Sequence, residues 1–323
     1  MAALGAILPN SLSPPYPPLP PAVSGERFEF DSIAGRICVY VAGKGPPLLL
    51  IHTINASASA AEVRPMHEHF QASRTVFSID LPGYGFSERT DREYNPRLMT
   101  DAILALVKQI HASFGEAPID ALAVSLSCEF LARAAMEQPT YFRKISLVSP
   151  TGFQGNASRR KPIGSTLAFP RLHRILAYPR WSDSLFRWLT KPGVIRYFLG
   201  RSWGSPNIDE TLWEYDLITT RQPGAKYAPL HFLAASMFSA DIHTVYESIN
   251  IPVWTSHGVR GDFTDYRNMK IIKHKPNWSN TIFPTGALPY FEVPVKFNDA
   301  LDKFLSCKKQ PQISRLFEQG SSG

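Results

Sequence analysis

The sequence predicts an α/β fold in which helices cover both faces of a mostly parallel sheet. Two observations predict this class. Short apolar runs typical of strands alternate with segments whose apolar residues recur at helical spacing. Several of these strands are apolar throughout, as in PLLLIH at 47–52, which indicates strands that are buried on both faces. Strands that alternate with helices form crossover units, and ligands then bind at the carboxyl ends of the strands.

The expected elements begin at residue 27. Residues 27–33 and 36–42 alternate like the two strands of a hairpin, with Gly35 at the turn. Later strands are short and apolar, and the helices between them carry apolar residues three and four positions apart. In chain order we expect strand 47–52, helix 60–70, strand 75–80, helix 98–114, strand 119–124, helix 128–137, strand 144–149, strand 252–257, helix 266–274, strand 279–283 and helix 295–305.

The length of 323 residues fits one α/β domain with an insert. The alternation breaks between the sixth and seventh strands, in a segment rich in Trp, Arg and Pro that predicts several short helices. Such an insert is expected to be a lid over the active face of the sheet. The predicted organisation is a proline-rich disordered leader at 1–26, a core at 27–152 and 251–307, a helical cap at 153–250 and a flexible tail at 308–323.

Composition excludes several classes of protein. A chain that is 44% hydrophobic and 19% charged can bury a core, which excludes a disordered protein and a disulfide-stabilised miniprotein. No apolar run approaches the ~18 residues that a membrane span requires. The three cysteines, Cys38, Cys128 and Cys307, lie far apart without metal-ligand spacing, so we expect reduced packing residues in a cytoplasmic protein. No motif implies a metal or a cofactor.

The net charge of +7 is concentrated in the first half of the cap. Between residues 153 and 203 the only acid is Asp183, and aromatic residues are interleaved with ten basic ones. This pattern predicts a cap whose aromatics line an apolar pocket while its arginines face solvent; the alternative is peripheral contact with an anionic membrane. We expect no nucleic-acid partner, because no binding motif accompanies the charge. The ten are Arg159, Arg160, Lys161, Arg171, Arg174, Arg180, Arg187, Lys191, Arg196 and Arg201.

Ser125 lies between a predicted strand and a predicted helix, in the run Ala-Val-Ser-Leu-Ser at 123–127. The run resembles the nucleophile elbow of the α/β-hydrolase fold, where small residues flank the serine because the turn is too tight for larger ones. Ala123 and Ser127 stand where glycines are usual, and both are small. The resemblance therefore implies that Ser125 is a nucleophile.

Two further segments carry this resemblance. Asp-Leu-Pro-Gly-Tyr-Gly-Phe-Ser at 80–87 is similar to the D-x-P-G-x-G-x-S segment that follows the fourth strand in the superfamily. His52 and Thr53 are similar to its His-Gly pair, with threonine in place of glycine. The resemblance covers nearly all of 27–305 and implies the α/β-hydrolase fold. It also implies an oxyanion hole formed by the amides of Ile54 and Leu126, with His52 as a structural anchor more than a base.

The resemblance places the catalytic acid in the loop after the seventh strand. Residues 257–265, HGVRGDFTD, are similar to the G-x-x-D turn of the superfamily but are one residue longer. Asp262 is the expected acid, and Asp265 is the alternative because the extra residue shifts the register.

The expected base is missing. The superfamily usually has Gly-His after the eighth strand, and here Ala287 occupies the position of the histidine. A second position where the histidine could lie, residue 290, holds a tyrosine, and no histidine follows His274. The loss of one triad member typically slows catalysis by about 10⁴–10⁶-fold. Histidines elsewhere are the possible substitutes: His257, His52, His231 and His243.

Two functions are therefore compared. The first is an enzyme that hydrolyses an ester, thioester or similar bond in a lipophilic small molecule, with Ser125 attacking and Asp262 orienting a base. A related possibility is an enzyme whose reaction needs the oxyanion hole and the pocket but not a serine nucleophile. The second is a non-catalytic relative that binds an apolar or lipid ligand under its basic aromatic cap. Ser125 and Asp262 favour the enzyme, which we expect, whereas Ala287 favours binding.

Overall fold

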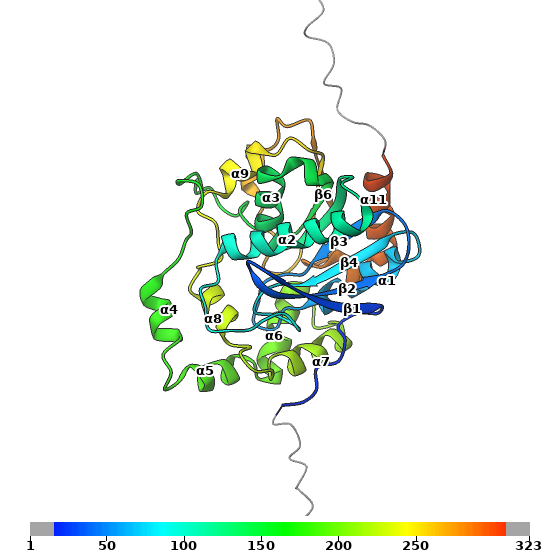
Figure 1. Cartoon of the computed structure of the whole chain (residues 1–323). Coiled ribbons are helices and arrows are strands. Elements are labelled where there is room, and N and C mark those ends of the chain that lie inside the picture. Colours follow the sequence, from blue (N-terminus) through cyan, green and yellow to red (C-terminus); the bar gives the residue numbers. More distant parts are fainter. Residues whose placement is uncertain (1–15, 308–323) are drawn as a thin grey trace, which may run out of the picture.

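The computed structural model describes residues 16–307, which form a twisted eight-stranded sheet with helices on both faces (Figure 1). The strand order is β1-β2-β4-β3-β5-β6-β7-β8; β1–β2 and β2–β4 pair antiparallel, and the remaining neighbours pair parallel. The predicted α/β class with a mostly parallel sheet is confirmed. The strands are β1 (Glu26–Ser32), β2 (Gly35–Ala42), β3 (Pro47–Ile51), β4 (Thr75–Asp80), β5 (Ile119–Val124), β6 (Phe142–Val148), β7 (Val253–His257) and β8 (Trp278–Ile282).

Two hydrophobic cores lie on opposite faces of the sheet. Along β3 the side chains alternate, so Leu49 and Ile51 enter one core while Leu48 and Leu50 enter the other. This explains why the run is apolar at every position. Helices α2 (Pro96–Phe114), α3 (Ser127–Glu137) and α9 (Ile242–Ser248) pack on the first face; α1 (Arg64–Phe70) and α11 (Pro294–Ser306) pack on the second (Figure 1).

Every predicted strand is present, shifted by two residues at most. The predicted helix 266–274 is wrong in extent: only a 3₁₀ turn forms within it, at Arg267–Ile271. The short helix at 289–292 was not predicted. The short helical elements of the core are η1 (Ala60–Val63), η2 (Pro139–Tyr141), η3 (Arg267–Ile271) and α10 (Pro289–Glu292).

Six helices lie between β6 and β7, within residues 153–250, which we call the cap segment. Figure 1 shows α4 to α8 gathered on one side of the sheet, whereas α9 returns beside α3. Helices α4 and α5 stand at the outer end of this group. The cap helices are α4 (Pro170–Leu176), α5 (Ser182–Leu189), α6 (Pro192–Trp203), α7 (Glu210–Thr219), α8 (Tyr227–Leu233) and α9.

The described part of the predicted leader packs on the body of the protein. Ala22 and Val23 are buried, and β1 already begins at Glu26. Proline has no backbone N–H to donate but keeps a carbonyl oxygen that accepts hydrogen bonds, and Tyr215 donates its hydroxyl to that of Pro20 at 3.1 Å. The expected disordered leader therefore does not hold for residues 16–26. Residues 1–15 and the predicted tail 308–323 lie outside the described residues.

None of the helices within residues 16–307 is long and apolar enough to cross a membrane.

Candidate functional site

Ser125 occupies a sharp turn between β5 and α3, with φ of 55°. This left-handed conformation costs a residue other than glycine about 1–2 kcal/mol. The turn is held because the Ser125 amide donates to the Val148 carbonyl oxygen at 2.8 Å. Ala123 and Ser127 are completely buried on either side, which explains why both positions carry small residues. The Ser125 side chain is half-buried and lines a cavity.

This cavity has a volume of about 380 Å³ and a largely apolar lining. The core contributes Ile54 and Leu126 beside the serine, and the cap segment contributes mostly apolar side chains. The backbone amides of Ile54 and Leu126 donate no hydrogen bond to any group in residues 16–307. Buried amides are nearly always paired, so two unpaired ones at a cavity that holds a serine suit a bound oxyanion. The cap residues are Leu189, Ile195, Phe198, Leu199, Arg201, Ser202, Pro229, Phe232, Leu233 and Phe238.

A buried carboxyl group holds the loop that carries Ile54. Glu62 accepts hydrogen bonds from the Thr53 amide at 2.8 Å and from the Thr53 hydroxyl at 2.9 Å. Asn55 donates its side-chain amide to the same carboxyl group at 2.6 Å. The Thr53 hydroxyl that departs from the superfamily glycine thus has a partner. Glu62 was not predicted from the sequence; its signal was an acid among the apolar residues of the run Ala-Ala-Glu-Val at 60–63.

A second carboxyl group, that of Asp216 on α7, lies near Glu62 and is completely buried. Neither of its oxygens has a hydrogen-bond partner within the described part of the chain. Burial, and then the nearby Glu62 charge, raise the pKa of Asp216 well above its ordinary value. Burial also raises the pKa of Glu62 to about 7, although its hydrogen bonds with Thr53 and Asn55 oppose this change. Burial therefore favours the protonated form of both acids.

The raised pKa of Glu62 predicts how stability depends on pH. The folded state favours the protonated acid, so this stabilisation is full below the ordinary pKa of 4.5 and is lost as pH rises through about 7. The loss amounts to about 3 kcal/mol. Glu62→Gln should therefore become more stable relative to the wild type between about pH 5 and pH 8. Urea denaturation at several pH values measures this difference. Glu68→Gln, on the exposed side of α1, is the matched control, and a constant difference for Glu62→Gln would contradict the prediction.

The structure brings Asp262 to the cavity but leaves Asp265 away from its lining. Asp262 forms a two-pronged ion pair with Arg201 of α6, with N–O distances of 2.5 Å and 2.6 Å. Asp265 pairs with Arg267 and accepts from the Gly155 amide, and these contacts lower the pKa of its carboxyl group. An arginine from the cap segment thus holds the acid that the sequence predicts would orient a histidine.

Ala287 also lines the cavity, and the last turn of α6 packs directly against it. Its amide donates to the Ser202 carbonyl oxygen at 2.8 Å. A Cβ atom at Gly286 would lie 2.4 Å from the carbonyl oxygens of Ser202 and Trp203, which explains the glycine. The end of α6 therefore touches both the loop of Asp262 and the loop where the resemblance places a histidine.

All nine histidines lie within residues 16–307, and none lines the cavity. His52 is engaged at both ring nitrogens: Nδ1 bonds to the Thr53 carbonyl oxygen at 2.6 Å, and Nε2 accepts from the Leu81 amide at 3.0 Å. Burial lowers the pKa of His52 to about 4. His257 bonds to the Gly258 carbonyl oxygen and stacks on Tyr266, with ring centroids 3.8 Å apart.

The two cap histidines are engaged elsewhere as well. His243 contacts the Gly152 carbonyl oxygen at 2.7 Å through Nε2, and its Nδ1 accepts from the Arg159 amide. His231 stacks on His173, with ring centroids 3.7 Å apart. The geometry therefore brings none of the four suggested substitutes to Ser125.

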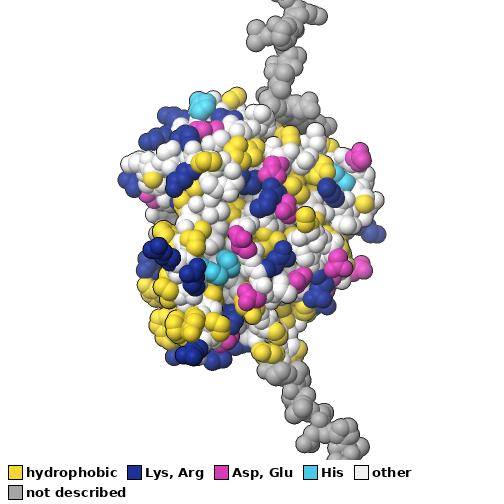
Figure 2. Space-filling model, turned by 60° about the vertical axis from the view of Figure 1, so that its left-hand side comes forward, with side chains coloured by type: hydrophobic (Ala, Val, Ile, Leu, Met, Phe, Trp, Pro, Cys, Tyr) yellow, Lys and Arg dark blue, Asp and Glu magenta, His cyan; other side chains and the backbone are white. Residues whose placement is uncertain are grey.

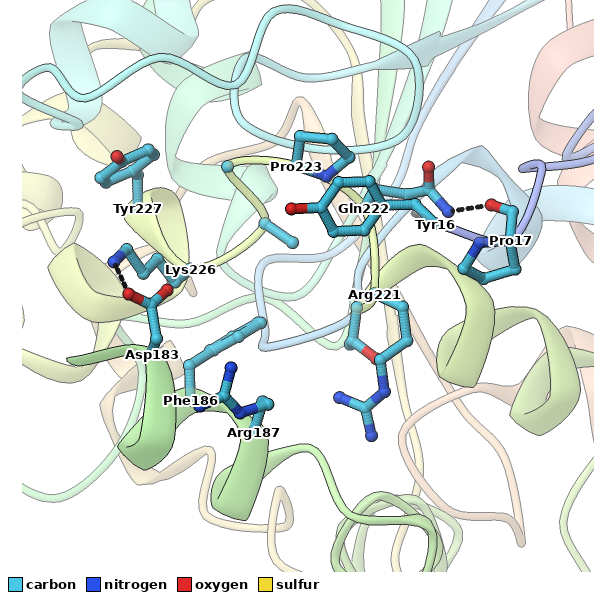
Figure 3. A pocket seen from close by; sticks show the side chains of 13 residues that line it. Tyr16, Pro17, Asp183, Phe186, Arg187, Arg221, Gln222, Pro223, Lys226 and Tyr227 are labelled. Atoms are coloured by element: carbon cyan, nitrogen blue, oxygen red, sulfur yellow. Dashed lines mark hydrogen bonds and ion pairs between the residues drawn. The ribbon is translucent and has the colours of Figure 1, made fainter. Parts of the chain in front are cut away.

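A second cavity, of about 510 Å³, lies between α5, residues 220–227 and residues 16–17 (Figure 3). Its lining contains no serine, cysteine or histidine. Lys226 pairs with Asp183 there at 2.8 Å, and Gln222 donates to the Pro17 carbonyl oxygen at 2.8 Å. This lining has none of the nucleophile chemistry of the Ser125 cavity. No group of three or more His, Cys, Asp or Glu side chains that could hold a metal ion occurs in the described residues.

Comparisons with known proteins find similar folds. The family model described as the α/β hydrolase fold matches residues 46–183. No curated protein matches the chain significantly by sequence. Similar solved structures include three hydrolases: 2-hydroxy-6-oxo-6-phenylhexa-2,4-dienoate hydrolase from a Rhodococcus species (18% identity, 88% of this chain and 100% of that chain, TM-score 0.67), the epoxide hydrolase CorEH (18%, 87% and 98%, 0.65) and the carboxylesterase CesB from Bacillus subtilis (14%, 87% and 92%, 0.62).

Proposed function

Because the chain belongs to the α/β-hydrolase fold superfamily, we propose that it hydrolyses an ester, thioester or similar bond in a lipophilic small molecule through Ser125. The observation that carries this proposal is the serine at φ of 55°, which lines a mostly apolar cavity together with two unpaired backbone amides. Strain of this kind is concentrated at functional sites. The names of the similar structures, among them a carboxylesterase and a deformylase, also favour a hydrolase.

The proposed reaction has two steps. The Ser125 oxygen attacks the carbonyl carbon, and the carbonyl electron pair moves onto the oxygen, which the Ile54 and Leu126 amides stabilise. Collapse of this intermediate expels the alcohol or thiol, which takes up the serine proton, and water then releases the acyl group as an acid. Since no imidazole lies at the serine, the proton passes through water or the leaving group. We therefore expect a slow hydrolase.

The apolar lining defines the substrate class. A cavity of about 380 Å³ accommodates a small acyl or aryl group, and its burial against the Leu and Phe side chains of the cap supplies most of the binding energy. The ionisable residues of the cavity are Glu62, Arg201 and Asp262. Burial favours the protonated form of Glu62, and the charges of Arg201 and Asp262 neutralise one another. An uncharged substrate suits this lining best.

A second candidate function is binding without catalysis. The ion pair between Arg201 and Asp262 favours it, because this pair occupies the carboxylate that a catalytic base would need. Ala287 in the cavity wall favours it too. In that case the cavity would hold an uncharged apolar ligand and leave it unchanged.

Covalent labelling distinguishes the two functions. The protein is incubated with a fluorophosphonate probe, and the modified residue is mapped by mass spectrometry. We expect a single label on Ser125. Mapping matters because Ser57 and Ser202 also line the cavity. A label on either of these serines, or none after prolonged incubation, would contradict the assignment of Ser125 as nucleophile and favour the binding function.

A further inference from the structure

The outer face of the cap segment exposes large apolar side chains. On α4, α5, α6 and their connections, eight such residues are between 40% and 61% exposed. Figure 2 shows hydrophobic side chains gathered beside Lys and Arg side chains on this side of the molecule. Isolated exposed apolar residues are normal, but a contiguous group marks an interaction site. We call this group the aromatic surface: Phe169, Leu172, Ile175, Tyr178, Trp181, Trp188, Tyr197 and Phe198.

The aromatic surface is positively charged. Five basic side chains of α4, α5 and their flanking turns are exposed and have no acidic partner within the described part of the chain. The only acid between residues 166 and 203 is Asp183, and Lys226 neutralises it (Figure 3). The nearby pairs Arg196–Glu210 and Arg201–Asp262 are each balanced. The five unpaired cations are Arg171, Arg174, Arg180, Arg187 and Lys191.

The mouth of the Ser125 cavity opens onto this surface. Three residues that line the cavity are also exposed, namely Phe198 (57%), Leu233 (43%) and Phe263 (38%). Phe169 adjoins this mouth, because its amide donates to the carbonyl oxygen of Ala234, the residue after Leu233, at 2.9 Å. On α5, the exposed Trp188 directly precedes the cavity residue Leu189. The exposed apolar residues therefore continue into the cavity wall.

We propose that the aromatic surface docks on an anionic phospholipid membrane and presents the cavity mouth to the lipid. Trp and Tyr side chains settle at the depth of the headgroups, while Arg and Lys pair with lipid phosphates. Charge complementarity selects this partner. If two copies of the chain paired through this surface across a two-fold axis, the unpaired cations of one copy would face those of the other. Like-charge repulsion disfavours such a dimer. An apolar substrate dissolved in the bilayer would reach Ser125 without crossing water; this last step rests on the proposed function, whereas docking does not.

Vesicle flotation tests the docking. The probes are vesicles of pure phosphatidylcholine and of phosphatidylcholine with about one quarter phosphatidylglycerol, at low (~0.05 M) and high (~0.5 M) salt. We expect binding that is at least about 10-fold tighter to the anionic vesicles and that is weakened at high salt. Trp181→Ser with Trp188→Ser should weaken binding about 10-fold, as should Arg171→Gln, Arg174→Gln and Arg180→Gln together.

A matched variant removes equal charge elsewhere. Lys108→Gln, Lys296→Gln and Lys303→Gln lie on exposed positions of α2 and α11, and Val295→Ser removes an exposed apolar side chain there. These changes should leave vesicle binding unchanged. An independent readout needs no variant: brominated lipids should quench the fluorescence of the exposed tryptophans, Trp181 and Trp188, when anionic vesicles are present.

Several results would overturn the docking. They are equal binding to both vesicle types, no binding to either, or an equal loss in the matched variant. A dimer by light scattering that the Trp181→Ser and Trp188→Ser changes dissociate would assign the surface to a second copy. Binding to RNA without binding to vesicles would assign it to nucleic acid. Ser125→Ala should bind vesicles like the wild type, so failure of the docking and failure of the proposed hydrolysis are separable.

Discussion

Ser125→Ala is expected to abolish fluorophosphonate labelling and to lower kcat for a p-nitrophenyl ester by about 10²-fold or more. The wild type lacks a histidine at the serine, so its kcat is already low. The fold-loss in kcat on removing the serine is therefore smaller than the ~10⁶-fold loss in an enzyme with a complete triad. KM should change little, because the apolar cavity wall is retained. The substitution changes only the side chain on this turn, whose φ is 55° in the wild type, so the melting temperature should also be unchanged.

Cavity serines supply the controls for this variant. Ser57→Ala and Ser202→Ala remove hydroxyl groups from the same lining and should keep labelling and turnover within a few-fold of the wild type. If Ser125→Ala retains turnover while losing the label, water attacks the substrate directly in the oxyanion hole. That outcome would support the proposed hydrolytic activity but contradict the assignment of Ser125 as the nucleophile.

Local sequence patterns predicted the parts of the fold that local forces determine. The run at 47–52 is apolar because alternate residues enter two different cores, which is a property of any strand buried on both faces. Ser125 was found because the constraint on its turn, small neighbours between a strand and a helix, lies within five residues. In contrast, the packing of residues 16–26 depends on Tyr40 and Tyr215, which lie far along the chain.

The parts of the site that could not be predicted from the sequence depend on contacts between distant segments. Glu62 and Asp216 meet across more than 150 residues, and no periodicity connects them. Arg201 reaches Asp262 only because the end of α6 packs on the loops after β7 and β8. The histidines illustrate the same point, since a strand-end residue such as His257 can turn toward the cavity or toward a neighbouring ring. Tyr266, nine residues later, decides this orientation.

The ion pair between Arg201 and Asp262 leads to the second prediction of large effect. Ala287→His places an imidazole in the cavity wall, where the resemblance expects the base. Alone it should raise kcat/KM only a few-fold, because Arg201 still holds the carboxylate that would orient the ring. Combined with Arg201→Ala, which frees Asp262, it should raise kcat/KM by about 10²–10⁴-fold, the usual contribution of a positioned general base.

The pH profile separates a true base from a change in cavity shape. In the double variant kcat/KM should rise with pH through a value near the ordinary histidine pKa of ~6.5, since only the neutral imidazole accepts the serine proton. Arg201→Ala alone and Ala287→Gln with Arg201→Ala should show neither the gain nor this rise. An equal gain from Ala287→His alone would mean that Asp262 plays no part. Because the carboxylate matters only when an imidazole is present, the two substitutions must be strongly non-additive, and additive effects would refute the proposed link between Arg201 and the missing triad.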